Sequence, residues 1–179
     1  QFWKHKNHRT VVEALRISKS RHCPVTVVCS GETTDYRHPG YTNEISQRVA
    51  DLGLSDNFRI LGTIPHIHVM QLMRQALAVL QPSLFEGWST SVEEIKSIGK
   101  SIILSNLDVH REQNPPSASY LEPLDAETLA THLILVIEEG QAGPDSDLEC
   151  RAREQLPRRT RAFALSFIDI VKDVLKRNV

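Results

Sequence analysis

Two glutamates, Glu86 and Glu94, stand eight positions apart on either side of a glycine turn at Gly87, and this spacing suits the binding of a polar ligand. The surrounding sequence is QPSLFEGWSTSVEE, which is typical of a strand end, a turn and a helix start. Hydroxyl side chains and free backbone N–H groups follow where the helix begins, at Ser89, Thr90 and Ser91. Because a helix N-terminus attracts anions, a diphosphate fits there; a capped helix beside an unrelated acid is the plainer alternative.

Helical periodicity separates the two adjacent acids at the end of this segment. At about 100° per residue, an apolar stripe runs through Val92, Ile95 and Ile98. Glu93 points nearly opposite to the stripe, whereas Glu94 lies at its edge. We therefore expect Glu93 to be solvated and Glu94 to be partly sheltered on a pocket wall. An ionised carboxylate only accepts hydrogen bonds, so Glu94 suits the two hydroxyl groups of a ribose.

Apolar runs of strand length alternate with amphipathic stretches of helix length along residues 1–139. The predicted strands cover residues 24–30, 57–61, 76–81, 101–105 and 119–122. The predicted helices cover residues 8–21, 41–52, 68–75, 89–98 and 125–139. This alternation predicts an α/β domain with a Rossmann-like, doubly wound parallel sheet, in which ligands bind at the carboxyl ends of the strands.

The sequence after residue 139 has a different character. Residues 140–147, GQAGPDSD, predict a polar hinge. Residues 148–179 predict a C-terminal helical appendage that is interrupted near Pro157, because proline lacks an N–H group and clashes with the preceding turn. Its apolar positions between Ala162 and Val174 form a surface that we expect to pack on another part of a parent protein. The first residue is Gln1, so we expect this chain to be a piece of something longer.

The overall composition argues against several classes of protein. The 21 basic and 22 acidic residues nearly cancel, so we expect no nucleic acid as a partner. The three cysteines form no CxxC pair, which indicates neither a disulfide framework nor a zinc ribbon and fits a reducing cytoplasm. No apolar run approaches the ~18 residues that a transmembrane helix needs.

Two short motifs look like known sites but lack the necessary context. The triplet GKS at residues 99–101 matches the end of a P-loop, yet Glu94 stands where that motif needs a glycine. His66 and His68 form an H-x-H pair, for which a surface position is a better interpretation than a metal site. We therefore expect no metal and no cofactor.

The segment around the two acids resembles the retaining glycosyltransferases of family 4, which carry the pattern E-G-x-G-x-x-x-x-E. Glu86 and Glu94 match its two acids. Flanking stretches also match, at Pro82-Ser83, Gly99–Ile103 and Leu61–Ile64. The likeness covers roughly residues 1–139 and implies the C-terminal half of a GT-B fold. The sequence departs from the family at Gln1, where an arginine is usual, and at Ser89, where the second glycine is usual.

The resemblance implies a role for each matching residue. Lys6 would bind the donor diphosphate, and Glu94 would hold the ribose. Glu86 would be the catalytic residue, near the hydroxyls or the reacting face of the transferred sugar. Backbone groups of the turn would contact the sugar and phosphates, at Gly87, Trp88, Ser89 and Thr90. The segment after the second strand would complete the donor site, at Gly62, Thr63 and Ile64.

The resemblance also implies the reaction, which is hexosyl transfer of a mannosyltransferase-like type from a nucleoside-diphosphate sugar, with retention of configuration. The acceptor, a glycan or a lipid-linked molecule, would bind to an N-terminal domain outside this sequence. We expect a cytoplasmic protein whose full-length form associates peripherally with the membrane. Two alternatives stay open: a non-catalytic nucleotide-sugar-binding module, motivated by the missing arginine, and a GT-B nucleotide-sugar epimerase.

Overall fold

The strands form two parallel groups in the computed structural model, which describes residues 1–177. One group pairs β1 (Val27–Cys29) with β2 (Phe58–Ile60). The other has the order β3-β4-β5 and consists of β3 (Val79–Gln81), β4 (Ile102–Ser105) and β5 (Ala118–Leu121). The predicted α/β fold with five parallel strands is confirmed, although four of the strands are shorter than predicted.

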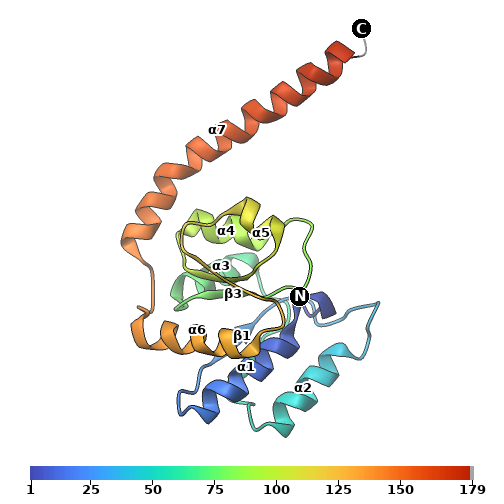
Figure 1. Cartoon of the computed structure of the whole chain (residues 1–179), viewed down its shortest axis with the longest axis vertical. Helices are drawn as coiled ribbons and strands as arrows, with labels where there is room; N and C mark the ends of the chain where they lie inside the picture. The colour runs from blue at the N-terminus through green and yellow to red at the C-terminus, as the bar shows by residue number, and fades with distance from the viewer. Residues whose placement is uncertain (178–179) are drawn as a thin grey trace.

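Helices cover the strands on both sides. Five of them lie where the sequence predicts them: α1 (His8–Ser20), α2 (Tyr41–Asp51), α3 (His66–Gln75), α4 (Thr90–Ile98) and α6 (Ala126–Glu139). Two short elements are not predicted, η1 (Lys4–Lys6) and α5 (Asp108–Gln113), because so few residues show no helical period. Figure 1 shows α4 and α5 on one side of the strands and α1 and α6 on the other, as in a doubly wound sheet.

The interior consists of two apolar clusters. The larger joins α1, α2 and α6 to the first strands, and its fully buried members include Val12, Leu15, Ile45 and Leu129. The smaller lies between α4 and β4 and consists of Val92, Ile95, Ile102 and Leu104. Burying one such side chain contributes about 1.5–3 kcal/mol. The smaller cluster therefore fixes α4, with its two glutamates, on the sheet.

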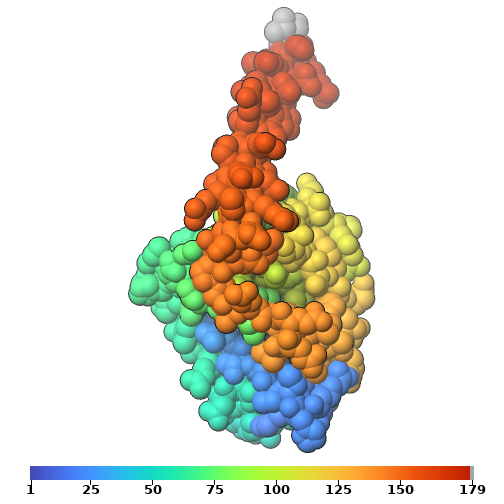
Figure 2. Space-filling view, turned by 90° about the vertical axis from the view of Figure 1, so that its left-hand side faces the viewer, coloured from blue at the N-terminus to red at the C-terminus, as the bar shows by residue number. Residues whose placement is uncertain are grey.

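The C-terminal helix α7 runs from Ser146 to Arg177 with Pro157 inside it, so the predicted interruption near Pro157 is wrong. The proline removes one backbone N–H, but the carbonyl of Arg153 that loses its donor lies on an exposed residue, where water can donate to it. The distal part of α7 stands clear of the body (Figure 2). Within residues 1–177, none of the helices is long and apolar enough to cross a membrane.

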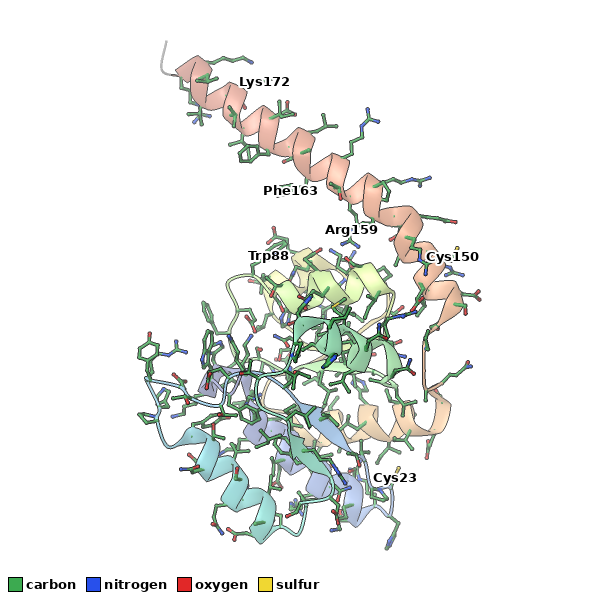
Figure 3. All side chains as sticks on the ribbon, turned by 180° about the vertical axis from the view of Figure 1, so that it is seen from behind. Cys23, Trp88, Cys150, Arg159, Phe163 and Lys172 are labelled. Carbon is green, nitrogen blue, oxygen red and sulfur yellow. The ribbon has the colours of Figure 1, made fainter. Side chains whose placement is uncertain are left out.

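The first part of α7 is anchored to the body. Glu149 accepts hydrogen bonds from Nε and Nη2 of Arg74, at 2.7 and 3.0 Å. Gly99 ends α4 with a φ of +64°, and a Cβ there would lie 2.2 Å from the carbonyl oxygen of Leu148, so glycine allows α7 to start close to α4. Figure 3 shows Arg159 reaching from α7 toward the body. The boundary that we predict at residues 140–147 stays a prediction.

Candidate functional site

The centre of the candidate site is an ion pair between Lys6 and Glu86. Nζ of Lys6 lies 2.6 Å from Oε1 of Glu86, whose side chain is only 8% exposed. Ser83 Oγ and Gln81 Nε2 also donate to this oxygen, at 2.7 and 3.0 Å. No residue of the described chain donates to Oε2 of Glu86, so that second oxygen is available to a ligand.

These contacts hold Glu86 in its ionised form. Partial burial acts to raise the pKa of Glu86, but the hydrogen bonds from Lys6, Ser83 and Gln81, together with the charge of Lys6, outweigh it. The pKa therefore lies below its ordinary value. At neutral pH the site presents a fixed carboxylate directly beside a cation.

Lys6 is placed by the short turn η1 and by Asn7, which follows it. Asn7 has a left-handed backbone, with φ 63° and ψ 36°, which asparagine tolerates better than most residues. Its buried amide donates to the carbonyls of Pro82 and Pro123, at 2.9 and 2.6 Å. The N-terminal turn is thereby fixed on the loop after β3, which carries Glu86. The sequence offers no signal for this role of Asn7 beyond its position next to Lys6.

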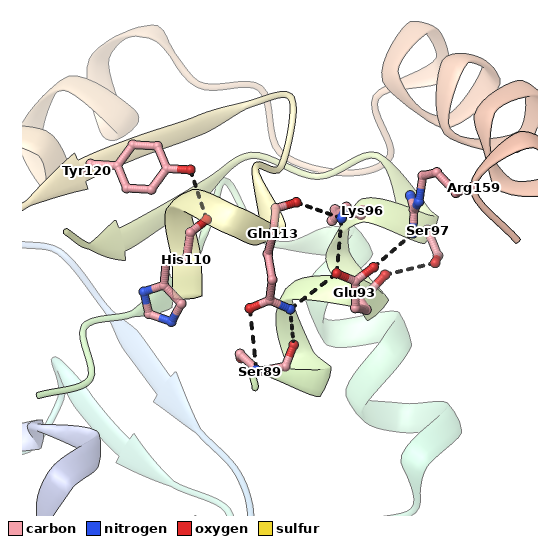
Figure 4. A network of polar contacts seen from close by, with 8 residues as sticks. All are labelled: Ser89, Glu93, Lys96, Ser97, His110, Gln113, Tyr120 and Arg159. Atoms are coloured by element: carbon pink, nitrogen blue, oxygen red, sulfur yellow. Dashed lines mark hydrogen bonds and ion pairs between the residues drawn. The ribbon is translucent and has the colours of Figure 1, made fainter. Parts of the chain in front are cut away.

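The backbone of Ser89, just before α4, is held by Gln113 at the end of α5. Nε2 of Gln113 donates to the Ser89 carbonyl at 2.8 Å, and Oε1 accepts from the Ser89 N–H at 3.4 Å (Figure 4). We expected this N–H to face the ligand, and here it is used by Gln113 instead. The next N–H groups, of Thr90 and Ser91, begin a helix and lack intrahelical partners, so they are the donors that α4 offers to an anion.

Glu94 is partly sheltered, as its helical phase predicts, with a side chain that is 31% exposed. Its Oε1 lies 2.9 Å from Nε2 of His66, at the start of α3. His66 thus has a nearby carboxylate that is distant in the sequence. Within residues 1–177, Glu94 makes no direct contact with the pair of Lys6 and Glu86. The structure therefore brings two of the three predicted charged residues together and places the third separately on α4.

Glu93 differs from the prediction. Its side chain is 32% exposed, which is close to the value for Glu94, so the expectation that Glu93 is simply solvated is wrong. Oε1 of Glu93 accepts from Lys96 at 3.0 Å and from Gln113 at 3.2 Å, and Oε2 accepts from Arg159 of α7 at 3.1 Å. The helical phase describes α4 alone, whereas two of these partners lie on α5 and on α7.

The loop between Glu86 and α4 leaves open space beside its backbone. A Cβ at Gly87 would meet no atom within 4 Å. Trp88 next to it is 52% exposed. After β2, the carbonyl of Gly62 accepts from the N–H of Gly31 at 2.8 Å, which joins the loops after β1 and β2. Thr63 and Ile64 follow at this same strand end, exposed and half-buried respectively.

The amino-acid sequence matches the family described as "Glycosyl transferases group 1" over residues 1–155. The chain belongs to this family. It is similar to the O-antigen chain mannosyltransferase RfbU of Salmonella typhimurium, with 26% identity over 123 residues. That alignment covers 69% of this chain and 33% of RfbU, so this group 1 chain spans about a third of that relative's length.

Solved structures show the same fold. A sucrose-phosphate synthase from Thermosynechococcus elongatus superposes with a TM-score of 0.74 at 18% identity, over 98% of this chain and 44% of that one. Anabaena Alr3699/HepE in complex with UDP superposes with a TM-score of 0.72 at 21% identity, over 93% and 46%. The group 1 chain therefore has the Rossmann-like architecture of a GT-B domain and spans less than half of either neighbour.

Within this group 1 fold, most of the predicted site residues lie after the ends of two strands. Gly62, Thr63 and Ile64 follow β2, and Glu86 to Thr90 follow β3. Their roles, and those of Lys6 and Glu94, stay predictions. Among residues 1–177, no three histidine, cysteine or acidic side chains gather closely enough to hold a metal ion.

Proposed function

We propose that this chain is the donor-binding half of a retaining hexosyltransferase of the family 4 type, which uses a nucleoside-diphosphate sugar and no metal. The ion pair of Lys6 and Glu86 carries the proposal, because it places a cation for a phosphate beside a carboxylate with one free oxygen. The names of the relatives support it: RfbU is called a mannosyltransferase, and the HepE structure contains UDP.

The diphosphate of the donor lies between Lys6 and the first turn of α4 in this proposal. The leaving diphosphate gains negative charge as the glycosidic bond breaks. Fixed positive groups therefore stabilise the transition state more than the bound donor. A charge-assisted hydrogen bond of this kind contributes about 1.5–3 kcal/mol. The N–H groups of Thr90 and Ser91 add the smaller contribution of a helix terminus, about 0.3–1 kcal/mol.

The sugar lies beside Glu86 and Gly87. Positive charge develops on the reacting carbon of the sugar, and the ionised carboxylate of Glu86 stabilises it or accepts from a sugar hydroxyl through Oε2. The bare backbone at Gly87 gives the ring room to approach. Glu94 accepts from the ribose hydroxyls, and its present partner His66 is exposed enough to move aside.

The acceptor lies on a second domain in this proposal. Apolar side chains around the donor loop are exposed, at Leu84, Phe85 and Trp88. Such a group next to a binding site indicates a surface that another part of the protein covers. We infer that an N-terminal domain closes over this loop with a glycan or lipid-linked acceptor. The whole protein would work in the cytoplasm, at the membrane surface.

The direct test is to incubate the full-length parent protein with UDP-, GDP- and ADP-hexoses and to determine the anomeric configuration of the product by NMR. Consumption of one donor with retained configuration supports the proposal. An inverted product contradicts the retaining mechanism. Release of an epimeric sugar nucleotide favours the epimerase, and binding without turnover, with any acceptor supplied, favours a non-catalytic module.

A further inference from the structure

A chain of polar contacts joins the C-terminal helix α7 to the turn before α4. We propose that Arg159, Glu93 and Gln113 are positioning residues, which transmit the position of α7 to the backbone of Ser89 and so set the affinity of the donor loop. The inference rests on the proposed function, because Ser89 belongs to the loop that would hold the donor sugar and diphosphate.

The first contact joins α7 to α4. Nη2 of Arg159 lies 3.1 Å from Oε2 of Glu93, and the two side chains are 29% and 32% exposed. An ion pair that is this exposed contributes little to global stability. Its effect is geometric, because it fixes which way the Glu93 carboxylate turns and ties that carboxylate to a helix that projects from the body (Figure 3).

The second contact joins Glu93 to Gln113. Oε1 of Glu93 accepts from Nε2 of Gln113 at 3.2 Å and from Nζ of Lys96 at 3.0 Å. Lys96 also donates to the backbone carbonyl of Gln113 at 2.6 Å. Both the side chain and the backbone of Gln113 are therefore held by α4, as Figure 4 shows.

The third contact joins Gln113 to Ser89, and both residues are only 3% exposed. The Gln113 amide pairs with the N–H and the carbonyl of the same residue. A flipped amide would place donor against donor and acceptor against acceptor, so its orientation is fixed by these partners. Gln113 thus fixes the peptide groups on both sides of Ser89, and with them the direction of the next N–H groups in the loop.

This network is not needed to hold α4 itself. Val92 and Ile95 already bury that helix against β4. What the network adds is the orientation of the turn that leads into α4, where the ligand would bind. Small displacements of groups that contact a ligand have large effects on binding and rate. A shift of α7 therefore reaches the donor loop through three side chains.

The test uses three variants of the full 179-residue chain: Arg159→Met, Gln113→Met and the double variant, with Arg158→Met as the matched control. Arg158 is the exposed neighbour of Arg159 on α7. Two readouts are taken for each: the Kd for UDP, GDP and pyrophosphate by calorimetry, and the ¹H–¹⁵N chemical shifts of the Ser89 and Thr90 amides. The unfolding midpoint of each variant shows whether a loss of affinity comes only from a loss of stability.

We expect Arg159→Met to raise the Kd about 3- to 10-fold and to shift the Ser89 amide, while Arg158→Met does neither. The double variant should bind no more weakly than Gln113→Met alone, since the residues act in series. The inference is overturned if the effects of the two substitutions on the Kd multiply in the double variant. It is also overturned if Arg159→Met matches Arg158→Met in both readouts. If Gln113→Met does not fold, the comparison of Arg159→Met with Arg158→Met alone tests the inference. If the wild type binds none of the three probes, the proposed function fails. The chemical shifts of the Ser89 and Thr90 amides then still show whether Arg159 positions the backbone of Ser89.

Discussion

Nζ of Lys6 lies 2.6 Å from Oε1 of Glu86, although 80 positions separate the two residues in the sequence. One comes from the N-terminal turn and the other from the loop after β3. The pair therefore joins the two segments that carry the proposed donor site. A phosphate that binds here has to share Lys6 with Glu86, so the charge of either residue affects both the fold and the binding.

Gly87→Ala should weaken donor binding without affecting stability. The added methyl group meets no protein atom within 4 Å and the φ of Gly87 is not positive, so the free energy of unfolding should change by less than about 0.5 kcal/mol. The methyl group would occupy space that we assign to the sugar, and we expect about a 10-fold loss of affinity for the nucleotide sugar. Gly40→Ala is the matched control, since a Cβ there also meets nothing. Equal affinities of the two variants would place the sugar elsewhere.

Glu94→Gln should weaken the binding of UDP or GDP about 10-fold and leave that of pyrophosphate unchanged. The reason is that we assign Glu94 to the ribose, and loss of a charge-assisted hydrogen bond costs about 1.5–3 kcal/mol. Calorimetric titration with each probe measures the contrast. Glu93→Gln should affect all probes alike, by a few-fold, because Glu93 acts through the backbone of Ser89. A variant of Glu94 that loses pyrophosphate binding would contradict the assignment to the ribose.

Buried His8 should make the domain less stable as the pH falls. Burial, with nearby positive charge, lowers the pKa of His8 to about 3, against an ordinary value of 6.5. Between these values the unfolded chain binds a proton that the folded chain does not, so stability falls with decreasing pH, by about 2 kcal/mol from pH 7 to pH 5. Urea unfolding at both pH values measures this loss. His8→Phe keeps the stacking on Phe2, whose ring centroid lies 4.3 Å away, and should remove most of the difference in stability between pH 7 and pH 5. An unchanged difference in stability would mean that His8 is not its cause.

The distal part of α7 should exchange its backbone hydrogens quickly in this chain. Phe163, Phe167 and Ile170 are 74%, 59% and 60% exposed, so little packing protects the amides from residue 162 to residue 174. We expect the same amides to be protected in the full-length protein if the proposed N-terminal domain covers the apolar side of α7. Slow exchange in a monomeric 179-residue chain would show that this segment belongs to the domain's own core.

The fold could be predicted from the sequence because alternating strands and helices leave a clear period, and the burial of Val92 and Ile95 follows directly from it. The contact of Glu93 with Arg159 could not be predicted, because it depends on α7, which the sequence indicated would be broken near Pro157. Gln113 gave no signal either, since α5 is too short to show a period. The motif identified Lys6 and Glu86 separately, whereas their contact is a property of the tertiary structure.

The most direct test of the donor site is the affinity of Lys6→Met for pyrophosphate and for UDP or GDP, measured by calorimetry beside the wild type. Lys4→Met is the control, because Lys4 is an exposed cation of the same turn. We predict at least a 10-fold loss for Lys6→Met with every probe that the wild type binds, and less than a 2-fold change for Lys4→Met. Wild-type affinity in a folded Lys6→Met protein would contradict the assignment of the diphosphate to Lys6 and, with it, the proposed donor site.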